Sequence, residues 1–234
     1  EFWVALSVGL VSALALAISF SRGFWVAGLM AIALSAVAMR ARPGRVLGLM
    51  VVLACAVLAG AYAAFGWRMF GVLSSLAGRF STISSPLAEV SVQERLVESK
   101  EVLKLISRNP IIGYGLGTAF RYMSLTRGFY REVSFVHNGY LFLVLKLGIV
   151  GLVSYFVFYF RGVALVLRSA REAASVWVRS SLFAAFGVLL AFLMLSLTSP
   201  QFYTKDAGLI IALALALAQA VALSRRGDTS EVAA

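Results

Sequence analysis

The sequence predicts an all-α membrane protein that crosses the bilayer about six times, with a long, partly helical loop between the third and fourth spans. Two observations support this fold class. Hydrophobic residues make up 61% of the chain and its mean hydropathy is +0.92, whereas soluble domains are roughly 45–50% apolar. The apolar residues also form continuous runs rather than the alternating pattern of a membrane β-barrel, so helices are expected.

Six apolar stretches are long enough, or nearly so, to cross a hydrocarbon core of about 30 Å. They cover residues 2–20, 24–39, 46–67, 138–160, 177–197 and 207–223. We therefore expect three membrane helices in 1–67, a loop over 68–136, three more helices in 137–223 and a tail over 224–234. Because the chain starts at Glu1 directly in an apolar run, we interpret it as a fragment that lacks upstream membrane helices.

The positions of the arginines predict how these spans are oriented in the membrane. Arginines gather after the second span, between the fourth and fifth, and at the start of the tail, all on one side if the spans alternate. They are Arg40, Arg42, Arg45, Arg161, Arg168, Arg171, Arg179, Arg225 and Arg226. The positive-inside rule makes that side cytoplasmic, so loop 68–136, Arg22 and His137 are expected on the opposite, outer face of the membrane. Much of the net charge of +11 lies in these loops, so it does not indicate nucleic-acid binding.

His137 is the only histidine, and it lies where the polar loop meets the fourth span. An imidazole takes or gives a proton near pH 7 at little cost, so His137 is a candidate general base. The simpler interpretation is a histidine that caps or anchors a membrane helix. No metal site is expected, because one histidine without clustered carboxylates supplies too few ligands.

The loop carries a helix signal. Ser91-Val92-Gln93-Glu94 has the form of a capping box, and Asn109-Pro110 is a stop signal, so we expect a helix over 92–108. Arg95 falls within the apolar arc of this helix, which is made of Val92, Leu96, Val102, Leu103 and Ile106. Either Arg95 pairs with Glu98 one turn further on, or it points into a cavity and holds an anion.

Two further segments have a structural and a functional interpretation. The glycine-rich run 109–117 is interpreted mainly as a tight turn back toward the membrane, although Gly113 and Gly115 could offer backbone amides to a phosphate. It lacks the Lys-Ser/Thr of a nucleotide-binding loop. Arg22 lies in a short turn between two spans, where it either reaches lipid headgroups or binds phosphate through its planar fork.

Three elements, in chain order, resemble motifs of the O-antigen ligase and polymerase superfamily. They are the tripeptide Ser21-Arg22-Gly23, the segment 95–115 and the run His137-Asn138-x9-Gly148-x2-Gly151. The resemblance covers about residues 15 to 155. It implies a fold like that of GT-C membrane glycosyltransferases, and transfer of a glycan from undecaprenyl diphosphate without a cofactor. Carried over by position, Arg22 and Arg95 would hold the diphosphate and His137 would serve the acceptor hydroxyl.

The residue types fit this chemistry. A lipid diphosphate is an activated leaving group, so catalysis needs charge stabilisation as it departs and a base for the incoming hydroxyl. A retaining mechanism would need a carboxylate nucleophile, and the loop offers no evident carboxylate pair, so we expect direct displacement with inversion. Glu98 and Glu132 are possible substitutes for the base, and Asn138, Gly113 and Gly115 are possible supporting residues.

Several functions share these features. A ligase would use a glycolipid such as lipid A–core as acceptor, and it is the favoured interpretation. A polymerase would use a growing glycan, and a protein O-oligosaccharyltransferase is a minor variant. A transporter of lipid-linked sugars is a different class, which would place charges near the bilayer midplane. The spans carry almost no ionisable residue apart from Lys146.

Overall fold

The computed structural model describes residues 22–40 and 90–232, together with residues 44, 48, 51, 52 and 55. The expected span 2–20 and nearly all of the expected span 46–67 lie outside the described residues. Within the described part, three helices are long and apolar enough to cross a membrane. They are α6 (Gly139–Glu172), α7 (Val176–Leu195) and the apolar part, Lys205–Ser224, of α8 (Lys205–Val232). These helices agree with the expected all-α membrane fold.

The helix boundaries differ from the hydropathy-based ones at two places. The expected fourth span ends before Arg161, but α6 continues to Glu172, because arginine is a good helix former and its charge does not end a helix. In the same way α8 continues to Val232, into the segment expected as a tail. The expected second span corresponds to α2 (Arg22–Ala38).

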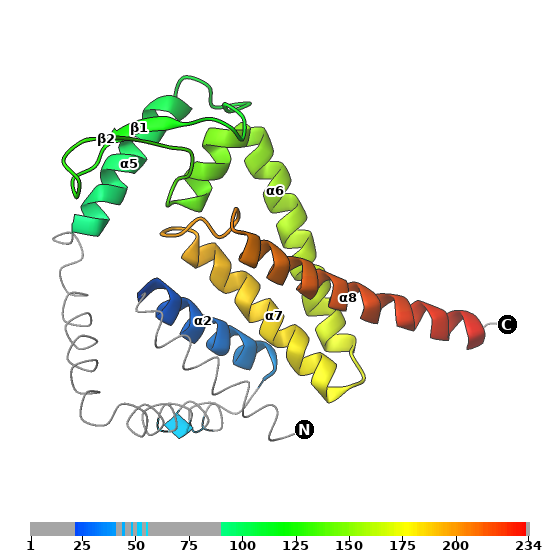
Figure 1. The fold of residues 1–234 in the computed structure, drawn as a ribbon. Helices are drawn as coiled ribbons and strands as arrows, with labels where there is room; N and C mark the ends of the chain where they lie inside the picture. Colours follow the sequence, from blue (N-terminus) through cyan, green and yellow to red (C-terminus); the bar gives the residue numbers. More distant parts are fainter. Residues whose placement is uncertain are drawn as a thin grey trace.

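Helices α2 and α7 pack side by side and run in opposite directions (Figure 1). Small residues form their contact: Ala27 packs against Ala191 and Leu195, and a Cβ on Gly187 would collide with the carbonyl oxygen of Ala31. Close approach of this kind is how membrane helices gain packing energy in the absence of a hydrophobic drive. The register places the start of α2 at the same end as the end of α7.

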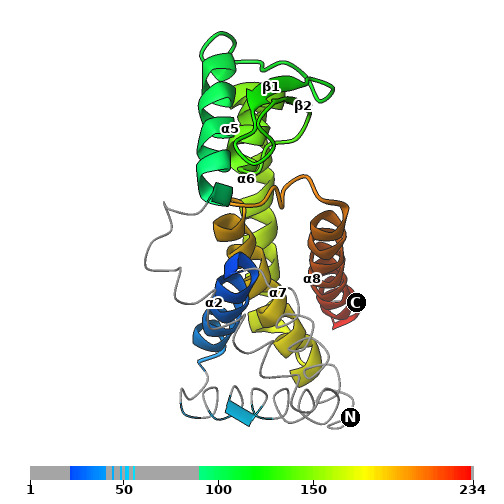
Figure 2. The ribbon, with the colours of Figure 1, turned by 60° about the vertical axis from the view of Figure 1, so that its left-hand side comes forward.

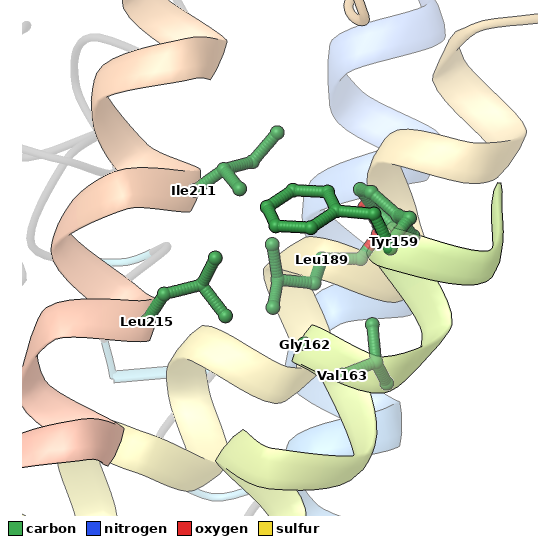
Figure 3. Close-up of a pocket in the computed structure, with 7 residues that line it drawn as sticks. Tyr159, Gly162, Val163, Leu189, Ile211 and Leu215 are labelled. Carbon is green, nitrogen blue, oxygen red and sulfur yellow. Dashed lines mark hydrogen bonds between the residues drawn. The ribbon is translucent and has the colours of Figure 1, made fainter. Parts of the chain in front are cut away.

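Helix α6 packs against α7 and α8 through a shared apolar cluster that includes Tyr159, Val163 and Leu189. Figure 3 shows where the three helices meet, with Gly162 beside Leu215. A Cβ on Gly162 would lie 2.7 Å from Leu215 Cδ2, so glycine permits this approach. The space between these side chains leaves no room for a water molecule, which marks it as packed core rather than as a ligand site.

Residues 90–138 form a separate layer, called the loop layer below, at one end of the helices (Figures 1 and 2). It contains α5 (Val90–Ile106) and two strands, β1 (Phe120–Met123) and β2 (Tyr130–Val133). The strands pair antiparallel, with Phe120 opposite Val133. A buried cluster joins the layer to the start of α6; its members are Val102, Phe120, Tyr122, Val136, Phe142, Leu143 and Leu145.

Two details of the loop helix were wrong in the sequence-based prediction. Glu94 does not close a capping box, because its carboxylate instead accepts hydrogen bonds from the hydroxyls of Ser124 (2.6 Å), Tyr122 (3.3 Å) and Thr126. These bonds lower the pKa of Glu94, with Ser124 as the main cause. The buried face of α5 also differs from the apolar arc expected from the sequence. Leu96 and Leu103 are exposed, while Glu98 is only 1% exposed.

The glycine-rich turn is docked into a break in α6, which confirms the structural interpretation of 109–117. Gly148, inside α6, has φ 68° and ψ −173°, a conformation open essentially to glycine alone. Four backbone hydrogen bonds join the turn to the break. They run from Tyr114 N–H to Leu145 O (2.9 Å), Gly115 N–H to Lys146 O (2.8 Å), Ile149 N–H to Pro110 O (2.8 Å) and Val150 N–H to Ile111 O (3.3 Å).

The break divides α6 into a half-helix, Gly139–Leu147, and a longer segment after Gly148. The carbonyls of Leu145 and Lys146, which lose their helical partners at the break, are satisfied by the turn. The half-helix is enclosed by protein, since Phe142, Leu143 and Leu145 are all buried. It therefore packs against the core of the loop layer.

Candidate functional site

The central feature of the site is a pair formed by Glu98 of α5 and His137, which lies two residues before the start of α6. Glu98 Oε1 accepts the backbone N–H of His137 at 2.7 Å, and Glu98 Oε2 lies 2.5 Å from His137 Nδ1. The Glu98 side chain is almost completely buried, whereas a third of the His137 side chain is exposed. The carboxylate therefore holds the ring from its buried side.

This contact sets the tautomer of the imidazole. An ionised carboxylate can only accept hydrogen bonds, so in the neutral imidazole the proton lies on Nδ1 and the lone pair on Nε2. No described residue forms a hydrogen bond with Nε2. Phe135 packs edge-on against the ring, with 5.0 Å between centroids. His137 thus has one nitrogen fixed inside the protein and one available to a ligand, which is the arrangement that a general base requires.

Of the two interpretations of Arg95, the structure does not show the pair with Glu98; both Glu98 oxygens instead contact His137. Among the described residues, Arg95 has no ion-pair or hydrogen-bond partner. At 100° per residue it lies about 20° around α5 from Val102, and Val102 packs in one cluster with Val136. Arg95 is therefore on the flank of α5 that carries the segment leading to His137.

Arg22 is the first residue of α2. Because Ala27 packs against Leu195, the start of α2 lies level with Ser196, just past the end of α7. The Ser196 carbonyl accepts the backbone N–H of Gly139 at 2.7 Å. The backbone of Arg22 thus lies at the end of the bundle where the loop layer rests (Figure 1). The structure brings the starts of α2 and α6 to one end of the molecule.

Asn138 is the N-cap of α6. Its side-chain oxygen accepts the backbone N–H groups of Tyr140 (3.0 Å) and Leu141 (3.1 Å), which are unpaired at a helix start. The next residue, Gly139, lies in a tight position, since a Cβ there would be 3.2 Å from both Phe202 and Ser196 side-chain atoms. This cap and this close contact fix the direction in which the chain leaves His137.

Local packing explains why the two later positions of the histidine motif, 148 and 151, are glycine. Gly148 supplies the break in α6, and a Cβ there would collide with Ile111 O. Gly151 lies against the Leu147 side chain, where a Cβ would also collide. The motif therefore combines one titratable residue, His137, with the N-cap Asn138 and two glycines that allow the close packing of α6.

Gly113 and Gly115 both take part in the contact between the turn and the break in α6. Gly113 is pressed against the break, where a Cβ would lie 2.5 Å from Gly148 N. The Gly115 amide donates to Lys146 O and is therefore already engaged. Lys146 itself is buried; its ammonium donates to Thr118 O and lies 5.6 Å from the centroid of the Phe142 ring. This lysine ties the half-helix to the loop.

Glu132 lies elsewhere in the loop layer. It is paired in register with Arg121 and contributes to an open groove of about 360 Å³ between α5 and the strands. The other lining residues are Glu101, Lys104, Leu105, Arg108, Ala119, Phe120 and Arg121. Neither Glu98 nor His137 lines this groove, so the structure does not bring the two candidate substitute bases together.

In a comparison with protein families, a family model described as O-antigen ligase matches residues 7–156 of the chain. This range includes α2, the whole loop layer and the half-helix of α6 with its break. No curated protein matches the chain.

Proposed function

Because the chain belongs to the O-antigen ligase family, we propose that it transfers a glycan from undecaprenyl diphosphate to an acceptor hydroxyl at the periplasmic face of the bacterial inner membrane. The observation that carries the mechanism is the Glu98–His137 pair, with contacts of 2.7 and 2.5 Å and an Nε2 to which no described residue forms a hydrogen bond. The expected acceptor is a glycolipid of the lipid A–core kind.

In this mechanism His137 Nε2 takes the proton of the acceptor hydroxyl. The acceptor oxygen attacks the anomeric carbon of the donor sugar as the bond from that carbon to the diphosphate oxygen breaks. The bonding electron pair leaves with undecaprenyl diphosphate, and the configuration at the anomeric carbon inverts. No covalent glycosyl–enzyme intermediate forms, and the reaction needs no cofactor.

Glu98 has a positioning role in this reaction. Its negative charge lies directly beside Nδ1, so it stabilises the imidazolium that forms when Nε2 takes the proton. The same arrangement of carboxylate, imidazole and hydroxyl operates in serine hydrolases, where the carboxylate fixes the tautomer and stays ionised throughout. Loss of general-base assistance typically costs about 10²–10⁴-fold in rate.

Arg22 and Arg95 are proposed to bind the diphosphate. Two guanidinium groups can each form paired hydrogen bonds to phosphate oxygens, and they neutralise the charge that builds up as the leaving group departs. Supporting this role, Arg95 lies on the flank of α5 nearest the His137 segment and has no partner among the described residues. Arg22 is the first residue of α2, and the start of that helix lies level with Ser196.

The proposal is tested by reconstitution of purified full-length protein with an undecaprenyl-diphosphate-linked glycan in liposomes. The acceptor is offered in two separate reactions, as lipid A–core and as a second copy of the lipid-linked glycan. Product on lipid A–core supports the ligase. Elongated lipid-linked glycan alone assigns a polymerase instead. Movement of the donor across the bilayer without transfer in either reaction would assign a transporter.

A further inference from the structure

The docked turn exposes an apolar tip made of Ile111, Ile112 and Leu116. Their exposed fractions are 62%, 74% and 68%. No charged residue lies between Arg108 and Arg121, so the tip is uncharged within an otherwise basic loop. Large apolar side chains grouped in this way at the surface indicate contact with an apolar partner.

The tip is continuous with the outer surface of α6. Backbone hydrogen bonds from Ile149 to Pro110 and from Val150 to Ile111 hold it against the helix. Ile149, Val150 and Val153 are themselves 49%, 59% and 55% exposed, and they belong to a helix apolar enough to cross a membrane. The tip therefore extends an apolar surface that already exists on a membrane helix.

The height of α6 in the bilayer brings this surface into lipid. From Ile149 to Glu172 the helix is roughly 36 Å long at 1.5 Å per residue, against a hydrocarbon core of about 30 Å. Residues 149–160 carry no charge, whereas Arg161, Arg168 and Arg171 follow in the other half. These charges favour a position in which the arginine-bearing end reaches the interface and the end at Ile149 stays within the apolar layer.

We infer that Ile111, Ile112 and Leu116 insert into the bilayer and contact lipid acyl chains beside the outer end of α6. The turn is rigid enough to act as a wedge, because four backbone hydrogen bonds and the Gly113–Gly148 contact hold it. Since the same break carries the half-helix that begins after His137, insertion of the tip fixes the depth of His137 relative to the membrane surface. This inference does not depend on the proposed glycan transfer.

Spin labelling of the full-length protein in lipid nanodiscs tests the inference. Cys55, the only cysteine, is replaced by serine, and Ile112→Cys and Leu116→Cys are made separately in that background. Collision rates of the label with oxygen, which concentrates in lipid, and with a water-soluble nickel chelate are measured. Val153→Cys, on the exposed face of α6, is the lipid control, and Arg127→Cys, in the turn between β1 and β2, is the water control.

Insertion predicts that the labels at both tip positions collide with oxygen as strongly as the label at 153 and are shielded from nickel. Nickel collision comparable with position 127 would overturn the inference, because it would place the tip in water. Shielding from both reagents would also overturn it, since another protein segment would then cover the tip. Two tip positions guard against a variant that fails to fold.

Discussion

Both carboxylate oxygens of Glu98 are bonded to His137, one to the backbone N–H and one to Nδ1. The two residues are 39 positions apart in the chain, and they join the loop helix to the start of α6. One buried carboxylate therefore fixes the position of the histidine backbone and the tautomer of its ring. This double contact holds the ring in the orientation that the proposed general base needs, and it also fixes the chain at the start of α6.

Glu98→Gln should reduce transfer about 10²-fold or more. The glutamine keeps the size of the side chain and can still accept the backbone N–H. Its amide group then faces Nδ1 as a donor, so the ring proton moves to Nε2 and the free base is lost. The rate of glycan transfer and the affinity for donor are measured separately, and donor binding should be retained. Glu101→Gln, one turn along the same helix but exposed, is the matched control; equal activity of the two variants would contradict the positioning role.

His137→Ala should abolish transfer while leaving expression and donor binding largely intact. General-base assistance contributes about 10²–10⁴-fold, so a decrease of only a few-fold would argue against the role. The assay uses purified full-length protein with donor and acceptor. Glu132→Gln serves as the comparison, because Glu132 lines a groove that His137 does not reach. Near-normal turnover by His137→Ala with loss in Glu132→Gln would transfer the base role to Glu132.

Arg22→Lys and Arg95→Lys should each lose most of the activity although they keep the positive charge. Lysine presents a point charge and cannot reproduce the bidentate fork that a diphosphate accepts. The main effect should be weaker binding of the lipid-linked donor, measured directly. Arg127→Lys, an exposed arginine of the same loop layer, is the control. Normal donor binding by both test variants would reduce these arginines to membrane or structural contacts.

The described helices were predictable because their signal is local. Continuous apolar runs identify α2, α6, α7 and α8 without knowledge of the rest of the chain. The strands were missed, since β1 and β2 have four residues each and their pairing depends on the loop helix behind them. Glu94 shows the same limit: the local pattern suggested a cap, and hydroxyls 28 to 32 positions away bind it instead.

The sequence singled out His137 and Glu98 as candidate residues but did not predict that they pair. His137 stood out by its uniqueness and by its place at the start of a span. Glu98 lies about 40° around the loop helix from buried Val102, and a carboxylate on a packing face requires a partner. The sequence offered Arg95 one turn away. The partner is His137, which lies 39 positions further along the chain. Only the folded structure brings it against α5, so the local pattern of one helix could not predict the pair.

Gly148→Ala should destabilise the protein by at least about 1–3 kcal/mol, because alanine does not adopt the backbone conformation found there, and its Cβ would collide with Ile111 O. The thermal unfolding midpoint of the purified protein measures the effect, and glycan transfer should fall with it as the half-helix shifts. Gly117→Ala is the control, since nothing lies within 4 Å of its Cβ position and its φ is ordinary. Equal stability of the two variants would mean that the break tolerates a side chain.

Glu94→Gln should loosen the hairpin of β1 and β2 at neutral pH but not at acid pH. The hydroxyl of Ser124, followed by that of Thr126, lowers the pKa of Glu94 in the folded protein. A carboxyl whose folded pKa is depressed adds stability above its unfolded pKa, which is about 4.3 for glutamate, and this stability is lost as the pH falls through the lower folded value. The wild-type advantage should therefore be full at pH 7 and shrink steadily below about pH 4.

Hydrogen–deuterium exchange over residues 120–133 measures this effect locally, with wild type and variant compared at each pH so that the intrinsic exchange rate cancels. Faster exchange in Glu94→Gln at pH 7, converging with wild type in acid, is the expected result. Glu101→Gln, which removes only the exposed pair with Lys104, should leave this segment unchanged, because exposed ion pairs contribute little. A difference between Glu94→Gln and wild type that stays constant from pH 7 to pH 3 would show that the charge of Glu94 is not what holds the hairpin.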